Sequence, residues 1–149
     1  MAALLDVNVL IALVDRDHVH HDPIHRWFAA HATKGWATCS ITENGMVRVL
    51  SQPAYPSGQR SPAEAIQVLR ALKAAYRQVH EFWMDDVSLS DPSLFDSAYI
   101  TSSRQVTDAY LLGLAARRKQ RVVSFDRFLP WQAIRNGSAQ LIELPDVRK

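Results

Sequence analysis

The stretch Ala-Ala-Leu-Leu-Asp at residues 2–6 is a short apolar run that ends in an acid. Four consecutive apolar residues bounded in this way predict a buried strand. The apolar residues within 9–14 then predict a short helix, so the chain turns directly after Asp6. A short buried strand that leads into a helix is typical of α/β proteins with a parallel sheet.

The same alternation of strand and helix continues along the chain. Apolar spacing and turn residues predict further helices over residues 21–31, 41–50, 62–76 and 106–119. Further strands are predicted over residues 36–39, 80–84, 121–125 and 140–144. We therefore expect an α/β sandwich around a mainly parallel sheet, built as a single domain of residues 1–149.

The composition excludes several classes of protein. The chain has 48% apolar and 21% charged residues, as soluble globular proteins do, and its net charge of +2 is too small to indicate a polyanionic partner. The single cysteine, Cys39, excludes an intramolecular disulfide. No apolar run approaches the roughly 20 residues that span a bilayer, and the N-terminus lacks the basic start of a signal peptide. We expect a cytoplasmic protein with no membrane partner.

Four acids occupy corresponding places in the predicted elements. Asp6 and Asp126 each end an apolar strand, and Glu43 lies one helical turn past the end of another. Asp108 lies in the first turn of an amphipathic helix. Because the carboxyl ends of parallel strands meet at one edge of a sheet, we expect these four carboxylates to gather in one crevice there.

Each acid alone has an ordinary explanation, as a helix cap, a turn residue, a solvated side chain or a partner of the helix dipole. Together, four carboxylates would repel one another and raise their pKa values. Divalent cations relieve that repulsion, and Mg²⁺ prefers carboxylate oxygens and water. A site of this kind is suited to in-line cleavage of phosphodiester bonds.

Four segments resemble the PIN-domain nucleases and, among them, the VapC-type toxins. They are residues 4–11, 41–48, 107–111 and 124–128, which occur in the family's order and span nearly the whole chain. Two positions depart from the common pattern but stay polar: Ser124 stands where many members have threonine, and Asn8 where many have threonine or serine. The resemblance implies a PIN-like three-layer α/β/α sandwich and a metal-dependent endoribonuclease toxin that cleaves RNA.

The resemblance also implies roles for individual residues. The acids that match the quartet holding Mg²⁺ or Mn²⁺ are Asp6, Glu43, Asp108 and Asp126. Of these, the resemblance implies Asp6 and Asp108 as the metal ligands. Asn8 and Thr107 match polar groups that orient carboxylates or substrate. The family pattern further implies a cognate VapB-type antitoxin that blocks the site, and a homodimer of the toxin.

Basic residues close to the acidic motifs are candidates for contacts with RNA phosphates. Arg48, Arg104 and Arg127 flank these motifs and are expected at the rim of the crevice. The basic run at residues 117–121 follows a helix C-terminus, where cations are favoured in any case, so we interpret it as a solvated helix end.

Two other functions compete with nuclease activity. A phosphatase of the haloacid dehalogenase type also begins with a strand ending in aspartate, but it needs a second acid two residues later, where this chain has Asn8. The other alternative is a catalytically inactive PIN-fold module that binds RNA or a partner, which the loss of an acid would favour.

Two other residue patterns are not interpreted as sites. His21 and His25 have the spacing of a zinc-binding pair, but no further ligands are evident. Cys39 among apolar neighbours is expected to be an inert thiol.

Overall fold

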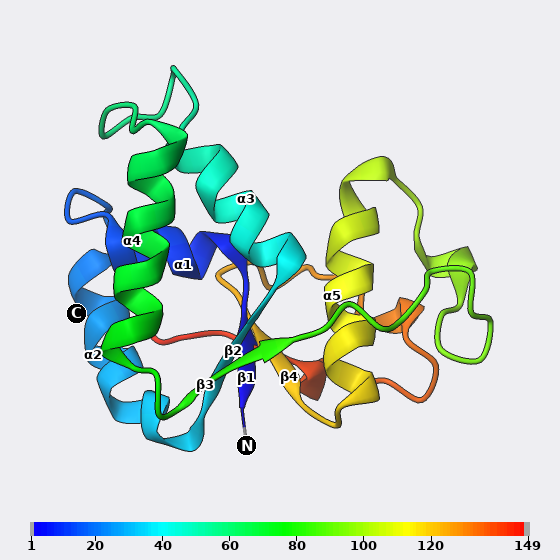
Figure 1. Cartoon of the computed structure of the whole chain (residues 1–149). Coiled ribbons are helices and arrows are strands. Elements are labelled where there is room, and N and C mark those ends of the chain that lie inside the picture. Colours follow the sequence, from blue (N-terminus) through cyan, green and yellow to red (C-terminus); the bar gives the residue numbers. More distant parts are fainter. Residues whose placement is uncertain (1, 148–149) are drawn as a thin grey trace.

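The computed structural model describes residues 2–147 and has a central sheet of five parallel strands with helices on both faces (Figure 1). The strands are β1 (Ala3–Leu5), β2 (Trp36–Cys39), β3 (His80–Trp83), β4 (Arg121–Val123) and β5 (Ile142–Glu143). Their order across the sheet is β3-β2-β1-β4-β5. The predicted α/β sandwich is confirmed, and within the described residues every strand pair is parallel.

The helices lie close to their predicted positions. They are α1 (Val7–Val14), α2 (His21–His31), α3 (Ser40–Leu50), α4 (Pro62–Ala75) and α5 (Val106–Arg117). Short 3₁₀ turns are η1 (Ala32–Lys34), η2 (Ser97–Tyr99), η3 (Ser103–Gln105), η4 (Trp131–Ala133) and η5 (Ala139–Leu141). Between residues 2 and 147, no helix is long and apolar enough to cross a membrane.

Alternating side chains of the central strands pack into two separate hydrophobic clusters. Leu4 and Val122 face α5, where they join one apolar cluster. Leu5 and Val123 face the opposite way and join the cluster formed with α1, α2, α3 and α4. Figure 1 shows this division, with α1 to α4 on one face of the sheet and α5 on the other. Because successive side chains of a strand point to opposite faces, the sheet lies between the two helical layers.

The register of β1 and β4 brings two parts of the site together. Leu5 is paired with Val123, and the Asp6 backbone N–H donates to the Val123 carbonyl oxygen at 2.9 Å. β4 ends at Val123, two residues earlier than predicted, and Ser124 begins the loop that carries the next acid. The first residues after the two central strands are therefore neighbours, although 118 positions separate them in the chain.

Candidate active site

Asp6 is fixed at the carboxyl edge of the sheet, where β1 passes into α1. It is the N-cap of α1, and its Oδ1 accepts a hydrogen bond of 2.8 Å from the Val7 backbone N–H. Its Oδ2 accepts a second bond of 2.7 Å from the Ser124 hydroxyl. Only 9% of the residue is exposed. Burial raises the pKa of Asp6, although both hydrogen bonds act in the opposite direction.

Ser124 is the hydrogen-bonding centre of this edge. Its hydroxyl donates to Asp6 and accepts from the Asn8 Nδ2 at 3.2 Å and the Asp126 backbone N–H at 3.1 Å. Asn8 also accepts from the Phe125 backbone N–H at 3.3 Å. The start of α1 and the loop after β4 are thus locked together. The sequence motifs identified Ser124 only as a polar residue where many family members have threonine. Its place directly after a buried strand and two residues before an acid could have indicated a role in the site.

Asp108 approaches the same edge from the first turn of α5. Burial, followed by the negative charges of Asp6 and Asp126, raises its pKa to about 6. Asp126 is exposed, and its Oδ1 accepts a 2.8 Å hydrogen bond from the Phe128 backbone N–H. Three of the predicted acids therefore interact electrostatically; we call Asp6, Asp108 and Asp126 the acidic trio.

The donor chemistry of the acidic trio fits a hard divalent cation. All three side chains offer carboxylate oxygens, and within residues 2–147 none of them forms an ion pair with a basic side chain. In the same part of the chain, no three acidic, histidine or cysteine side chains are grouped closely enough to hold an ion.

Glu43 belongs to a different network. Its Oε2 accepts hydrogen bonds from the Thr38 hydroxyl at 2.6 Å and from the Lys73 ammonium at 2.9 Å. The Thr38 oxygen also lies 2.8 Å from the His80 Nε2. Because the threonine hydrogen is donated to Glu43, His80 is the donor in that contact. The structure thus places the fourth predicted acid between β2, β3 and α4, paired with a lysine.

The remaining predicted site residues differ in their exposure. Asn8 is half-buried in the hydrogen-bond network of Ser124, and Thr107 is exposed beside Asp108. Arg48, Arg104 and Arg127 are all exposed. Arg48 lines a groove between α3 and α4, of which Glu43 is also part.

Several other polar residues have structural partners. The His21 Nδ1 lies 2.8 Å from the Ala12 carbonyl oxygen, and the His25 Nε2 lies 2.7 Å from that of Leu13, so this pair engages the C-terminal carbonyls of α1. Cys39 is fully buried, and its burial raises the pKa of the thiol, as expected for an inert group.

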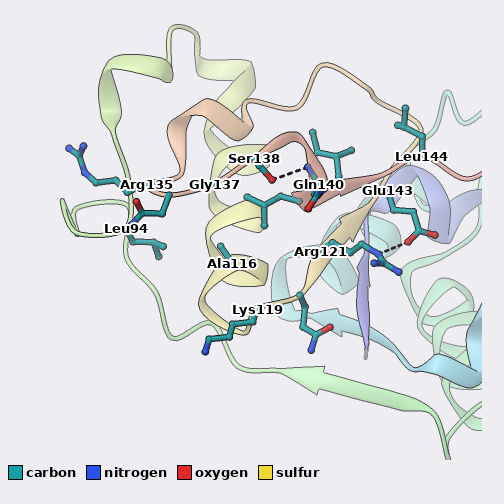
Figure 2. Close-up of a pocket in the computed structure, with 14 residues that line it drawn as sticks. Leu94, Ala116, Lys119, Arg121, Arg135, Gly137, Ser138, Gln140, Glu143 and Leu144 are labelled. Carbon is teal, nitrogen blue, oxygen red and sulfur yellow. Dashed lines mark hydrogen bonds and ion pairs between the residues drawn. The ribbon is translucent and has the colours of Figure 1, made fainter.

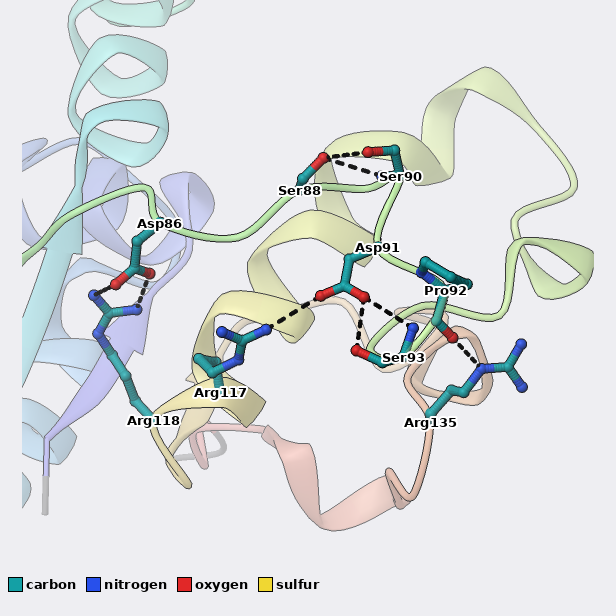
Figure 3. A network of polar contacts seen from close by, with 9 residues as sticks. All are labelled: Asp86, Ser88, Ser90, Asp91, Pro92, Ser93, Arg117, Arg118 and Arg135. Carbon is teal, nitrogen blue, oxygen red and sulfur yellow. Dashed lines mark hydrogen bonds and ion pairs between the residues drawn. The ribbon is translucent and has the colours of Figure 1, made fainter.

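The basic run at residues 117–121 was expected to be a solvated helix end, but several of its side chains form ion pairs. Arg118 forms an ion pair with Asp86 at 3.0 Å, and Arg117 one with Asp91 at 3.4 Å (Figure 3). Arg121 pairs with Glu143 inside a surface hollow of about 940 Å³ (Figure 2). No member of the acidic trio lines this hollow.

Comparison with known proteins identifies the family of the chain. The PIN-domain family profile matches residues 3–130. Ribonuclease VapC44 of Mycobacterium tuberculosis is 47% identical over 140 residues, which cover 94% of this chain and 96% of the relative. This chain belongs to the VapC ribonuclease family of PIN-domain proteins. Ribonuclease VapC38 of the same organism is 51% identical over 83% of this chain and 84% of its own length.

The VapC assignment confirms the family that the four sequence motifs indicated. A solved structure supports the fold: a crystal structure of VapBC2 from Rickettsia felis, bound to a promoter DNA fragment, aligns with a TM-score of 0.60. The alignment covers 98% of this chain and 100% of that one at 12% identity. The phosphatase alternative is excluded by the family, and the PIN-like α/β/α architecture is confirmed.

Proposed function

We propose that this VapC-family protein is a single-domain toxin that hydrolyses RNA phosphodiester bonds in a metal-dependent reaction. The observation that carries the proposal is the acidic trio, in which burial and neighbouring charge raise the pKa of Asp108 to about 6. Binding of a cation would relieve the repulsion among these carboxylates and so lower the free energy of the site. RNA as substrate is supported by relatives named ribonucleases at 44–51% identity.

The proposed cofactor is Mg²⁺, for which Mn²⁺ can substitute. Asp6 and Asp108 would hold it, with Asp126 beside them, because hard cations of this size prefer carboxylate oxygens and retained water. When bound, the ion supplies an activated water and a positive charge for the leaving oxygen. The chain itself must provide ionised, correctly oriented carboxylates.

Ser124 and Asn8 perform that orienting role. The Ser124 hydroxyl donates to Asp6 at 2.7 Å, which favours the ionised carboxylate and fixes one of its oxygens. Asn8 ties the Phe125 backbone to α1 and so holds the loop that carries Asp126. Thr107, exposed next to Asp108, is placed to contact substrate.

Glu43 is proposed as the fourth acid of the site, available when Lys73 releases it. The ion pair between them is partly exposed, with side-chain exposures of 32% for Lys73 and 16% for Glu43. Ion pairs of that kind contribute only about 0–1 kcal/mol. A metal and a negatively charged substrate can therefore compete with Lys73 for this carboxylate at small cost.

Three exposed arginines are proposed to contact RNA phosphates. Arg48 lies on α3, which carries Glu43. Arg104 lies on η3, directly before the helix of Asp108, and Arg127 follows Asp126. Phosphate contacts position the strand and make binding depend on salt, but they do not read bases.

The proposed macromolecular partners are an RNA substrate, a VapB-type antitoxin and a second copy of the chain. The antitoxin is supported by the R. felis structural neighbour, which is described as VapBC2. The homodimer rests on the family pattern. Because the proposed substrate is cellular RNA, the protein would act in the cytoplasm.

Cleavage of fluorescently labelled single-stranded RNA tests the proposal. We expect products with Mg²⁺ or Mn²⁺ and none with excess EDTA. Asp108→Asn should reduce the rate at least about 100-fold, since even groups that only support metal ligands contribute 10–100-fold. Asp17→Asn, the same change at an exposed loop acid, is the matched control and should cleave normally.

Two results would change the conclusion. Cleavage that persists in excess EDTA would overturn the metal-dependent mechanism. RNA binding with no cleavage under any metal would instead support the alternative of an inactive PIN-fold module that binds RNA or a partner.

A further inference from the structure

Phe128 is an exposed aromatic side chain at the edge of the acidic trio. It is 80% exposed, although it lies only two residues beyond Asp126. Its backbone N–H donates to the Asp126 Oδ1 at 2.8 Å, so its position is tied directly to a carboxylate of the trio. Burying an apolar ring of this size against a partner is favourable, so its exposure is notable.

The exposure of Phe128 does not come from a loosely held loop. On its N-terminal side, the Asp126 backbone N–H donates to Ser124 and that of Phe125 donates to Asn8. On its C-terminal side, Leu129 is only 3% exposed and belongs to the core beneath α5. The ring is therefore presented to solvent by a segment that is anchored on both sides.

A positively charged side chain lies beside the Phe128 ring. The Arg127 guanidinium carbon lies 5.6 Å from the centroid of the Phe128 ring, within range of a cation–π interaction. An exposed ring, a guanidinium and one carboxylate of the acidic trio thus occupy three consecutive residues, 126–128. This combination matches a nucleotide, whose base has a flat face and whose phosphate is an anion. Single-stranded RNA is generally recognised by stacking of unpaired bases on aromatic and arginine side chains.

We propose that Phe128 stacks on an RNA base next to the cleaved phosphate, while Arg127 contacts a neighbouring phosphate. The inference rests on the proposed ribonuclease function and adds a substrate-positioning residue to it. Stacking on a ring is tolerant of base identity, so Phe128 sets affinity and register more than sequence choice.

Binding of short single-stranded RNA by an Asp108→Asn protein tests the inference without cleavage. In that background Phe128→Ala should weaken binding about 5- to 100-fold, the range that one stacked base contributes. Phe128→Leu should be similarly weak, because it keeps an apolar side chain but removes the π-face. Phe128→Trp should bind at least as tightly as the parent.

Salt dependence and a matched control separate stacking from charge. Phe128→Ala should leave the slope of log Kd against log salt unchanged, whereas Arg127→Ala should reduce its magnitude by about 0.7, the value for one phosphate on a single strand. Phe82→Ala is the control: Phe82 is 48% exposed and has Lys73 over its ring, but it lies on β3, two strands away from β1. It should bind RNA like the parent.

The position of the stacked base can be found with RNAs that carry one abasic site. At the position stacked on Phe128, removing the base should weaken binding to the parent protein but not to Phe128→Ala. Unchanged affinity of Phe128→Ala for intact RNA would overturn the stacking assignment while the nuclease proposal stands. A parent that neither binds nor cleaves RNA would overturn the proposed function itself, and this inference with it.

Discussion

Replacing Asp108 with asparagine should stabilise the protein when no divalent cation is present. The pKa of Asp108 is about 6 in the folded protein, against a usual value of 3.8. The difference of about two pH units corresponds to roughly 3 kcal/mol of unfavourable free energy for the ionised form at pH 7. Solvent screening reduces this figure for a half-buried side chain. We therefore expect Asp108→Asn to raise the free energy of unfolding by about 1–2 kcal/mol.

The gain should depend on pH in a defined direction. Between the unfolded and folded pKa values of Asp108, the folded state binds the extra proton, so stability rises as the pH falls through 6 and levels off near 4. At pH 7 the cost of the charge is fully present in the unmodified protein. At pH 4.5 most of it is already relieved, and the advantage of Asp108→Asn should be small.

Asp6→Asn should behave differently, although Asp6 also has a raised pKa. Asp6 accepts a hydrogen bond from Ser124, whose oxygen already accepts from Asn8 and the Asp126 backbone. An asparagine amide would turn its N–H donors either toward that oxygen, which has no free lone pair, or toward the Val7 backbone N–H, which is itself a donor. From the sequence alone, relief of repulsion is expected at both positions. The structure predicts stabilisation for Asp108 and a loss for Asp6.

Urea unfolding in EDTA at pH 7 and pH 4.5 measures these effects, and thermal midpoints should shift by about 2–8 °C for the expected gain. Asp17→Asn removes one charge at an exposed position and should leave stability within about 0.5 kcal/mol. The reasoning is refuted if Asp108→Asn is less stable than the unmodified protein at pH 7, or if its gain is the same at both pH values.

Three further substitutions have defined outcomes. Ser124→Ala removes three hydrogen bonds and should lower the free energy of unfolding by about 2–3 kcal/mol, measured in urea, with a loss of RNA cleavage. Lys73→Met frees Glu43 and should tighten Mn²⁺ binding about two- to fivefold in calorimetry; weaker binding would argue against Glu43 as a ligand. Gly113→Ala should cost about 1–3 kcal/mol in the same unfolding assay, because its Cβ would overlap the ring of Phe95.

The fold was predictable because local signals agree with one another. Residues 2–6 combine a buried run, an acid and an immediate helix start, and the structure has β1 and α1 at these places. The predicted helix start at residue 62 is also confirmed, where Ser61 and Glu64 form a capping box at the start of α4. The end of β4 was predicted two residues late, because apolar character continues into Phe125 while the Ser124 hydroxyl turns inward to the site.

The acidic trio was predictable from topology, since parallel strands bring their carboxyl ends to one edge. Topology does not predict in which direction each side chain points, as Glu43 shows. By the alternation of β2, Thr38 shares a face with Trp36, which packs in the core on the side of α1 to α4. Glu43 follows Thr38 to that face and meets Lys73, which lies 30 positions away on another helix.

Glu43 and Lys73 are too far apart in the sequence for any helix or strand spacing to predict their contact. The sequence therefore predicts that the carboxylate lies near the sheet edge, but not which basic group it pairs with. The choice is a competition between one lysine and the charge of a cation at the acidic trio. A partly exposed ion pair holds only weakly, whereas burial and the charges of Asp6 and Asp126 raise the pKa of Asp108 to about 6, so a cation beside these carboxylates is favoured. We therefore expect Glu43, which pairs with Lys73 in this structure, to exchange that weak partner for a cation bound at the acidic trio.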